Sequence, residues 1–231
     1  MNKKTPIGIL ACATIMTANT AWADSSIEVS GNVNLTTNYT FRGITQTDKG
    51  PAIQGGLDLS HASGFYAGVW GSSVDFSDKT KMELNLLGGY SRSVGQFDLD
   101  IGGVYYAYPD SPELPTGTQN FFEVHAGVST DAGPFEIGTS LSYSPDFYGE
   151  VGSSVYWLTE AYLPVTDIIS VSAGYGVSEF ENENLADEYQ DFNIGLSADL
   201  SAVELDLRFV DTIDRNNSDD QTVVFSIART F

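Results

Sequence analysis

The sequence predicts an all-β protein, an antiparallel up-and-down transmembrane β-barrel of about twelve strands. Three observations lead to this fold class. Apolar and polar residues alternate with a period of two over many segments, which is typical of half-buried strands rather than helices. Longer polar loops and tight turns alternate along the chain, as they do in outer-membrane barrels. Beyond residue 23 no run of 18 apolar residues occurs, so we expect no transmembrane helix.

Residues 1–23 are expected to be a secretory signal peptide that precedes a barrel domain over residues 24–231. Lys3 and Lys4 form a basic start, a mostly apolar stretch follows, and 21–23 reads Ala-Trp-Ala, a cleavage site of small residues. An uncleaved anchor and a lipoprotein, with a faint lipobox ending at Cys12, are the alternatives. Cys12 is the single cysteine, so the mature chain is expected to lack disulfides and thiol chemistry.

The charge of the chain excludes one class of partner. Asp and Glu number 31 against 10 Lys and Arg, which gives a net charge of −21. Nucleic-acid binding needs a basic surface, so we expect no nucleic-acid partner. A disordered acidic chain is the simple alternative, but 12% aromatic residues and regular alternation argue against it.

Twelve segments carry the alternation, and each is about as long as a membrane-crossing strand. The expected strands are 32–42, 53–60, 65–70, 82–90, 97–106, 121–128, 135–143, 155–163, 169–177, 191–198, 203–210 and 223–231. Five tight turns are expected, at 61–64, 91–95, 131–134, 164–167 and 199–202. Six longer loops are expected between the other strands, among them 43–51, 109–119, 145–153, 179–188 and 211–220. Both chain ends of the barrel then lie at the tight-turn end, and closing the sheet uses the whole chain as one domain.

One stretch resembles a known family. Residues 38–47 read Asn-Tyr-Thr-Phe-Arg-Gly-Ile-Thr-Gln-Thr, followed by Pro-Ala-Ile-Gln-Gly-Gly at 51–56 and Gly-Phe-Tyr-Ala-Gly-Val-Trp-Gly-Ser at 64–72. This stretch resembles the TorF family of proteobacterial porin-like proteins, also known as the Gcw_chp domain. The likeness is specific over 38–76 and looser towards the C-terminus. It implies an outer-membrane barrel with a pore, and it supplies no catalytic residues.

Three features indicate that the apolar face of the sheet meets lipid and the polar face lines a wet lumen. Aromatic residues fall towards strand ends, where interfacial girdles lie; they are Tyr39, Phe41, Phe65, Tyr90, Phe97, Tyr105, Phe135, Tyr143 and Phe209. The last strand ends on Phe231, as in substrates of the barrel-assembly machinery, although Arg229 interrupts its alternation. The polar face also carries too many carboxylates for a dry core.

The candidate lumen residues are the charged side chains of this polar face. They are Arg42, Asp58, Glu83, Asp98, Asp100, Glu123, His125, Glu136, Glu160, Asp191, Glu204, Asp206 and Arg208. Arg42 is expected near the loop end of the first strand, either as a constriction charge that orients a solute or, preferably, as a salt bridge among carboxylates.

Chemistry beyond a pore has weak support. His125 shares a strand face with Glu123, but no nucleophile motif accompanies them, so no enzyme is expected. Two distant histidines without cysteine make a transition-metal site improbable. The loop 211–220 has oxygen ligands that suit Ca²⁺, but it lacks the glycine and final Glu of an EF-hand. We therefore expect neither a cofactor nor a metal, and a solvated loop that bridges lipopolysaccharide is preferred.

The expected function is a passive outer-membrane channel for small hydrophilic solutes, preferentially cationic or neutral, because carboxylate-lined pores favour cations. A closed barrel with a structural or surface-interaction role is the alternative, and an inward-folded 109–119 loop would favour it. Expected partners are outer-membrane lipid, lipopolysaccharide and the barrel-assembly machinery. A Gram-negative outer membrane is the expected location.

Overall fold

Twelve strands form one closed antiparallel barrel, which confirms the predicted fold class. The computed structural model describes residues 26–115, 117–182, 186–213 and 221–231, and within these ranges it contains strands, turns and loops without a helix. The wall consists of β1 (Ile27–Thr36), β4 (Ala52–His61), β5 (Phe65–Ser73), β6 (Met82–Val94), β7 (Phe97–Ala107), β8 (Phe121–Ala132), β9 (Phe135–Ser144), β10 (Ser154–Pro164), β11 (Ile169–Phe180), β12 (Tyr189–Asp199), β13 (Glu204–Ile213) and β14 (Thr222–Thr230).

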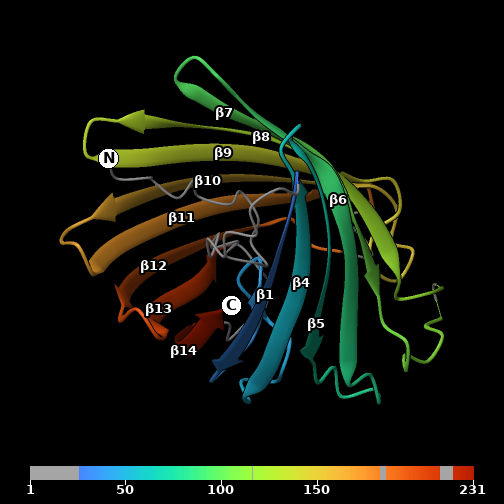
Figure 1. Cartoon of the computed structure of the whole chain (residues 1–231). Helices are drawn as coiled ribbons and strands as arrows, with labels where there is room; N and C mark the ends of the chain where they lie inside the picture. The colour runs from blue at the N-terminus through green and yellow to red at the C-terminus, as the bar shows by residue number, and fades with distance from the viewer. Residues whose placement is uncertain (1–25, 116, 183–185, 214–220) are drawn as a thin grey trace.

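Neighbouring wall strands are neighbours in the sequence, and β1 closes the ring by pairing with β14 (Figure 1). The β1–β14 register runs from Asn32 opposite Thr230 to Thr36 opposite Ser226. Backbone hydrogen bonds between Gly31 and Phe231, each 2.9 Å long, extend the seam by one step. Because the ring closes, every wall strand has a partner on both sides, as a strand in lipid requires.

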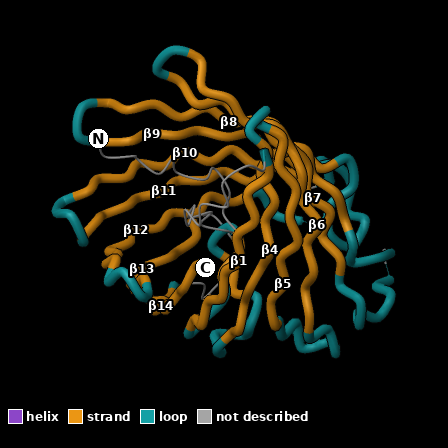
Figure 2. The backbone as a smooth tube through the Cα atoms, viewed as in Figure 1, coloured by secondary structure: helices purple, strands orange, loops and turns teal. Residues whose placement is uncertain are grey.

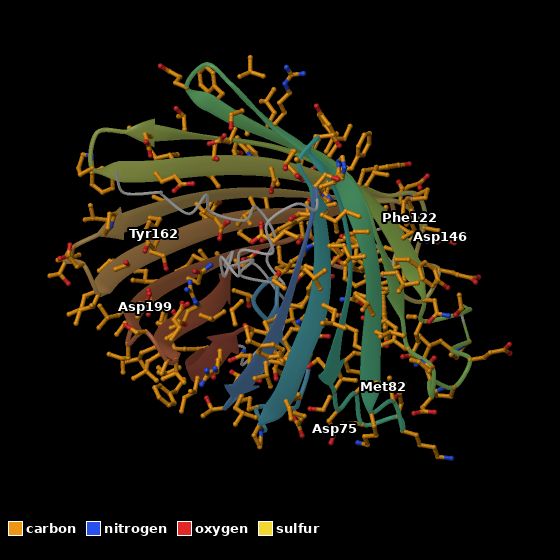
Figure 3. The ribbon with its side chains drawn as sticks, viewed as in Figure 1. Asp75, Met82, Phe122, Asp146, Tyr162 and Asp199 are labelled. Atoms are coloured by element: carbon orange, nitrogen blue, oxygen red, sulfur yellow. The ribbon has the colours of Figure 1, made fainter. Side chains whose placement is uncertain are left out.

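Tight turns and longer loops lie at opposite ends of the barrel (Figure 2). The turns after β6, β8 and β10 lie at the upper left of that view, and the loops after β5 and β7 lie at its lower right. Figure 3 shows the same arrangement of the two ends, with Asp75 and Asp146 at the loop end and Asp199 at the turn end. The predicted alternation of five turns and six loops is therefore confirmed.

Side chains alternate across the wall as the period-two pattern predicts. On β7, Leu99, Ile101 and Tyr105 are exposed on the outer face, whereas Val104 and Tyr106 are buried inside. The same pattern recurs around the ring, so an apolar outer face surrounds a polar and aromatic interior. Such a surface is suited to lipid rather than to water.

The predicted strand 32–42 is wrong in its second half. The wall strand β1 begins at Ile27, five residues earlier than expected, and ends at Thr36. The chain then leaves the wall, and Tyr39 is buried with Trp70 and Val74 inside the barrel. Tyr39 and Phe41 therefore do not belong to an outer aromatic girdle.

A short hairpin explains why the chain turns inward. β2 (Thr40–Phe41) pairs with β3 (Ile44–Thr45), and Arg42 and Gly43 form the two-residue turn between them. Both turn residues have positive φ, 49° for Arg42 and 83° for Gly43. Two consecutive positive φ angles are the geometry of tight hairpin turns whose usual sequence is Asn-Gly or Asp-Gly. We call residues 38–47 the inner hairpin.

The expected signal peptide and most of the 211–220 loop lie outside the described residues. Among the residues that are described, none forms a helix of the length and hydrophobicity that crossing a membrane requires.

Candidate functional site: the interior of the barrel

The base of the inner hairpin is fixed by Asn38. Its side-chain oxygen accepts hydrogen bonds from the hydroxyls of Thr45, at 2.6 Å, and Thr47, at 3.1 Å. The Thr47 hydroxyl is also close to the Tyr39 amide, which donates to it at 3.1 Å, and Gln46 N donates to Tyr39 O at 2.7 Å. Asn38 is buried, so this network holds the hairpin in one conformation inside the barrel.

The tip of the hairpin carries a buried ion pair. Nη2 of Arg42 donates to both carboxylate oxygens of Glu123 on β8, at 2.7 and 2.8 Å. The two side chains are only 5% and 4% exposed. The Arg42 guanidinium also lies 4.2 Å from the centre of the Tyr156 ring on β10, and Tyr106 Oη donates to Glu123 at 3.3 Å. Removal of either partner of this desolvated pair would leave an uncompensated buried charge, which is strongly destabilising.

A second carboxylate holds the opposite side of the hairpin. Tyr39 Oη lies 3.3 Å from both carboxylate oxygens of Glu83 on β6, and Asn85 donates to Glu83 at 2.8 Å. Tyr39 packs edge-on against Trp70 of β5, with ring centres 5.6 Å apart. Gly43 lies against Thr212 and Asp191, on β13 and β12. The hairpin thus contacts the wall on several sides of the lumen.

Aromatic rings continue from the hairpin across the loop end of the barrel. Phe41 packs against Tyr106, Tyr106 stacks on Phe121 with centres 4.3 Å apart, and Phe121 meets Phe147 at 4.6 Å. The row continues through Phe180 to Tyr189. Because these rings and the inner hairpin fill the loop end, that half of the interior is packed rather than lined by water. We call the hairpin and this aromatic row the plug.

Gln119, which is fully buried, links the loops after β5 and β7 at the loop end of the barrel, outside the plug. Its amide nitrogen donates to Asp78 at 2.7 Å, and its amide oxygen accepts from the Thr80 hydroxyl at 3.1 Å. Asp78 also accepts from the Thr80 amide at 2.9 Å. Most of residues 110–118 are exposed or half-exposed, so the inner hairpin, and not the 109–119 loop, enters the lumen.

Long polar side chains lie flat along the inner wall, over glycines of neighbouring strands. Tyr66 of β5 passes Gly89 and Gly102 to reach Asp100, at 3.2 Å, and His125, at 3.4 Å. Tyr156 of β10 passes Gly176 to reach Asp191 on β12, at 3.1 Å. These inward glycines are places of close approach, because a Cβ there would collide with the crossing side chain.

The turn-end half of the interior is polar and more accessible. Arg208 of β13 donates to Asn193 at 2.5 Å and to Asp206 at 3.1 Å, and its side chain is 31% exposed. Glu160 and Glu204 face the same region and are half-buried. We call this half the vestibule.

The structure divides the predicted lumen residues into two groups. Glu83, Glu123, His125 and Asp191 are buried, and each has a hydrogen-bond partner, so the prediction of a wet environment is wrong for them. The half-buried remainder on the inner wall is Asp58, Asp98, Asp100, Glu136, Glu160, Glu204, Asp206 and Arg208. Arg42 enters from the inner hairpin rather than from the first wall strand, and it forms the expected salt bridge.

Sequence reasoning missed the interior roles of Tyr39, Tyr66 and Tyr156. Tyr66 and Tyr156 are not among the predicted lumen residues, although each of these two tyrosines bonds a carboxylate two strands away. The Arg-Gly pair at 42–43 was the available signal for the hairpin, but this turn usually carries Asn or Asp.

No group of three or more His, Cys, Asp or Glu in the described part of the chain is placed to hold a metal ion. Three buried hydroxyls, those of Ser144, Ser154 and Ser178, have no hydrogen-bond partner among the described residues. Buried polar groups are normally satisfied, so these three indicate spare hydrogen-bonding capacity at the plug.

A closed antiparallel barrel with an apolar outer face and a polar interior defines an outer-membrane type of β-barrel. The profile of the family described as "Bacterial protein of unknown function (Gcw_chp)" matches residues 20–231. The chain belongs to this bacterial family. None of the curated proteins matches it.

Solved structures that share the barrel include two that cover most of this chain. A structure described as KdgM porin superposes with a TM-score of 0.59 and 8% identity, over 87% of this chain and 98% of the porin. An outer membrane channel from Pseudomonas putida F1 superposes with a TM-score of 0.56 and 12% identity, over 94% of this chain and all of the channel. At such low identity the likeness concerns the fold.

Proposed function

We propose that this protein is an outer-membrane channel for passive diffusion of small hydrophilic solutes, with a preference for cationic or neutral ones. The observation that carries the proposal is the vestibule, where half-buried carboxylates such as Glu160, Glu204 and Asp206 outnumber the single guanidinium of Arg208 among the described residues. Rings of carboxylates attract cations and repel anions. The shared fold of the two solved channels agrees with this role.

The plug makes the loop end the constriction of the proposed channel. Passage of solutes would require the inner hairpin to move away from the wall. The hairpin is attached to β1 and β4 and is not itself part of the barrel sheet. The pore would therefore be narrow, in keeping with a barrel of intermediate strand number. No reaction is proposed.

The biogenesis of the protein follows from the same proposal. Residues 1–23 would direct export, the barrel-assembly machinery would insert the barrel, and the loops would face lipopolysaccharide in the outer leaflet of a Gram-negative bacterium. Heat-modifiable migration of an outer-membrane fraction in gel electrophoresis tests this location. A soluble, periplasmic protein would contradict it.

Ion conductance of the refolded protein in a planar bilayer under a KCl gradient tests the channel itself. Discrete steps with a cation-selective reversal potential are expected. A triple variant with Glu160→Gln, Glu204→Gln and Asp206→Asn should lose much of that selectivity, whereas Asp146→Asn, in an exposed loop, should keep it. Anion-selective steps in the wild type would contradict the role of the vestibule.

A second candidate is a closed barrel with a structural or surface-interaction role, and the packed plug favours it. Deletion of residues 38–47 separates the two candidates. If the wild type inserts without conductance and the deletion variant conducts, the plug closes the native barrel. If both conduct, the structural role is rejected.

A further inference from the structure

The contacts of Arg42 describe a receptor for a guanidinium group. Both oxygens of the Glu123 carboxylate accept hydrogen bonds from one guanidinium nitrogen, Nη2, at 2.8 and 2.7 Å. The Tyr156 ring covers the group at 4.2 Å, and the ring of Phe147 lies 5.8 Å away. A carboxylate combined with aromatic faces is the chemistry that recognises guanidinium and other organic cations. We call Glu123, Tyr106, Phe147 and Tyr156 the cradle.

The cradle residues lie on wall strands and on the loop that carries Phe147, whereas Arg42 lies on the inner hairpin. Tyr106, Glu123 and Tyr156 are on β7, β8 and β10 and are held by the sheet ladder. Arg42 is at a two-residue turn with φ of 49°, a conformation that side chains other than Gly, Asn and Asp rarely adopt. The sheet therefore holds the cradle residues in place independently of Arg42. The strained turn places the Arg42 side chain in the cradle.

The surroundings of the cradle can bind more than a guanidinium. Ser178 is the cross-strand partner of Tyr156, and Ser154 lies two residues before Tyr156 on the same face. Both hydroxyls are at least nine-tenths buried and lack a partner among the described residues. A ligand with a second polar group next to its guanidinium would satisfy them.

We propose that the cradle is a binding site for guanidinium-bearing solutes, and that Arg42 occupies it as an internal competitor. The proposal rests on the proposed channel function, because it names a class of cation that the lumen receives. A solute such as arginine would displace the Arg42 side chain, bind Glu123 and Tyr156 in its place, and release the tip of the inner hairpin from the wall.

Binding to an Arg42→Met variant tests the site. Methionine keeps an apolar stem and removes the guanidinium, so the cradle is left without its competitor. Titration calorimetry of the refolded barrel in detergent micelles should show arginine and methylguanidinium binding to this variant at least about tenfold more tightly than to the wild type, because a tethered competitor has a high effective concentration. Citrulline, with an uncharged urea in place of the guanidinium, is the matched ligand and should not bind.

Glu123 provides the control for the location of the site. Adding Glu123→Gln to Arg42→Met should abolish arginine binding, while adding Asp167→Asn, a change in the exposed turn after β10, should leave it unchanged. Equal binding of arginine and citrulline, or binding that survives Glu123→Gln, would overturn the proposal.

Hydrogen exchange on the unmodified protein keeps the test independent of variant folding. Saturating arginine, but not citrulline, should accelerate exchange of the Gln46 amide, which donates to Tyr39 O across the inner hairpin. Unchanged exchange together with an absence of heat of binding would overturn the proposal. Conductance measurements on the same samples distinguish the guanidinium site from the channel function. Binding without conductance supports the site and rejects the channel. Conductance without binding supports the channel and rejects the site.

Discussion

Tyr66 on β5 reaches His125 on β8 across two intervening strands, with 3.4 Å between Oη and Nε2. Asp100 of β7 joins them, at 2.7 Å from His125 and 3.2 Å from Tyr66. The tyrosine side chain therefore runs around the circumference of the barrel instead of towards its axis. Such cross-strand links brace the wall and leave the centre of the lumen to other groups.

Gly102 should be required for this link. A Cβ at Gly102 would lie 2.7 Å from both Tyr66 Oη and the His125 ring, which is closer than packed atoms allow. We expect Gly102→Ala to lower the free energy of unfolding by about 1–3 kcal/mol, the usual cost of overpacking. Urea unfolding in lipid vesicles measures it. Gly88→Ala is the matched control, because its nearest neighbour would be 3.4 Å away, and an equal loss in both variants would contradict the explanation.

Arg42 and Glu123 should be strongly coupled. Removing one partner leaves a buried charge, so Arg42→Met or Glu123→Leu alone should cost about 3–5 kcal/mol of stability. The double variant should be much less destabilised than the sum of the single variants, because it leaves no uncompensated charge. A double-mutant cycle by urea unfolding gives the coupling energy. Additive losses would show that the ion pair does not hold the plug.

Gly43 should tolerate no side chain. Its φ of 83° disfavours other residues, and a Cβ would lie 2.6 Å from Thr212 and 2.8 Å from Asp191. Gly133 has a similar φ of 70° but open space around it. We expect Gly133→Ala to cost about 1 kcal/mol from backbone strain alone and Gly43→Ala to cost more, by about 1–3 kcal/mol for the collision. Equal costs would mean that the hairpin tip does not press on the wall.

Acid should loosen the loops over the plug. Partial burial of Asp78 tends to raise its pKa, but hydrogen bonds from Thr80 and Gln119 outweigh this effect and lower the pKa below its ordinary value. A lowered pKa means that the folded loops favour the ionised carboxylate, so the stabilisation is present above the ordinary pKa of about 4 and is lost as the pH falls through the folded value.

Amide exchange of Thr80 measures this effect. After correction for the intrinsic pH dependence of exchange, protection should fall below about pH 4 in the wild type. Asp78→Asn should show reduced protection at neutral pH and little further change in acid. A protection factor that is independent of pH in the wild type would contradict the role of Asp78.

The barrel itself could be predicted from the sequence because its determinants are local. Period-two alternation, five short turns and six longer loops each appear as a pattern of a few residues, and strands that are neighbours in the sequence pair in space. Leu99 and Ile101 on the outer face, and Asp98 and Asp100 on the inner face, follow directly from alternation.

The contents of the barrel could not be predicted in the same way. Tyr39, Phe41 and Arg42 continue the alternation of β1, so no local signal marks Thr36 as the last wall residue. Whether Glu123 meets water or a guanidinium depends on a contact between residues 81 positions apart. Side chains that fill a lumen are placed by such long-range contacts, which a periodic pattern does not encode.

The seam between β1 and β14 joins the first wall strand to the last. Ten residue pairs join β1 to β4, running from Ile27 opposite His61 to Thr36 opposite Ala52, whereas the β1–β14 register contains five. The ring has no complete wall until the last strand has been synthesised, and the inner hairpin that lies in its lumen is made directly after the first wall strand. Barrel closure therefore encloses the inner hairpin, which precedes most of the wall strands in the chain. The β1–β14 seam has fewer residue pairs than the β1–β4 pairing, so we expect the wall to open at this seam first.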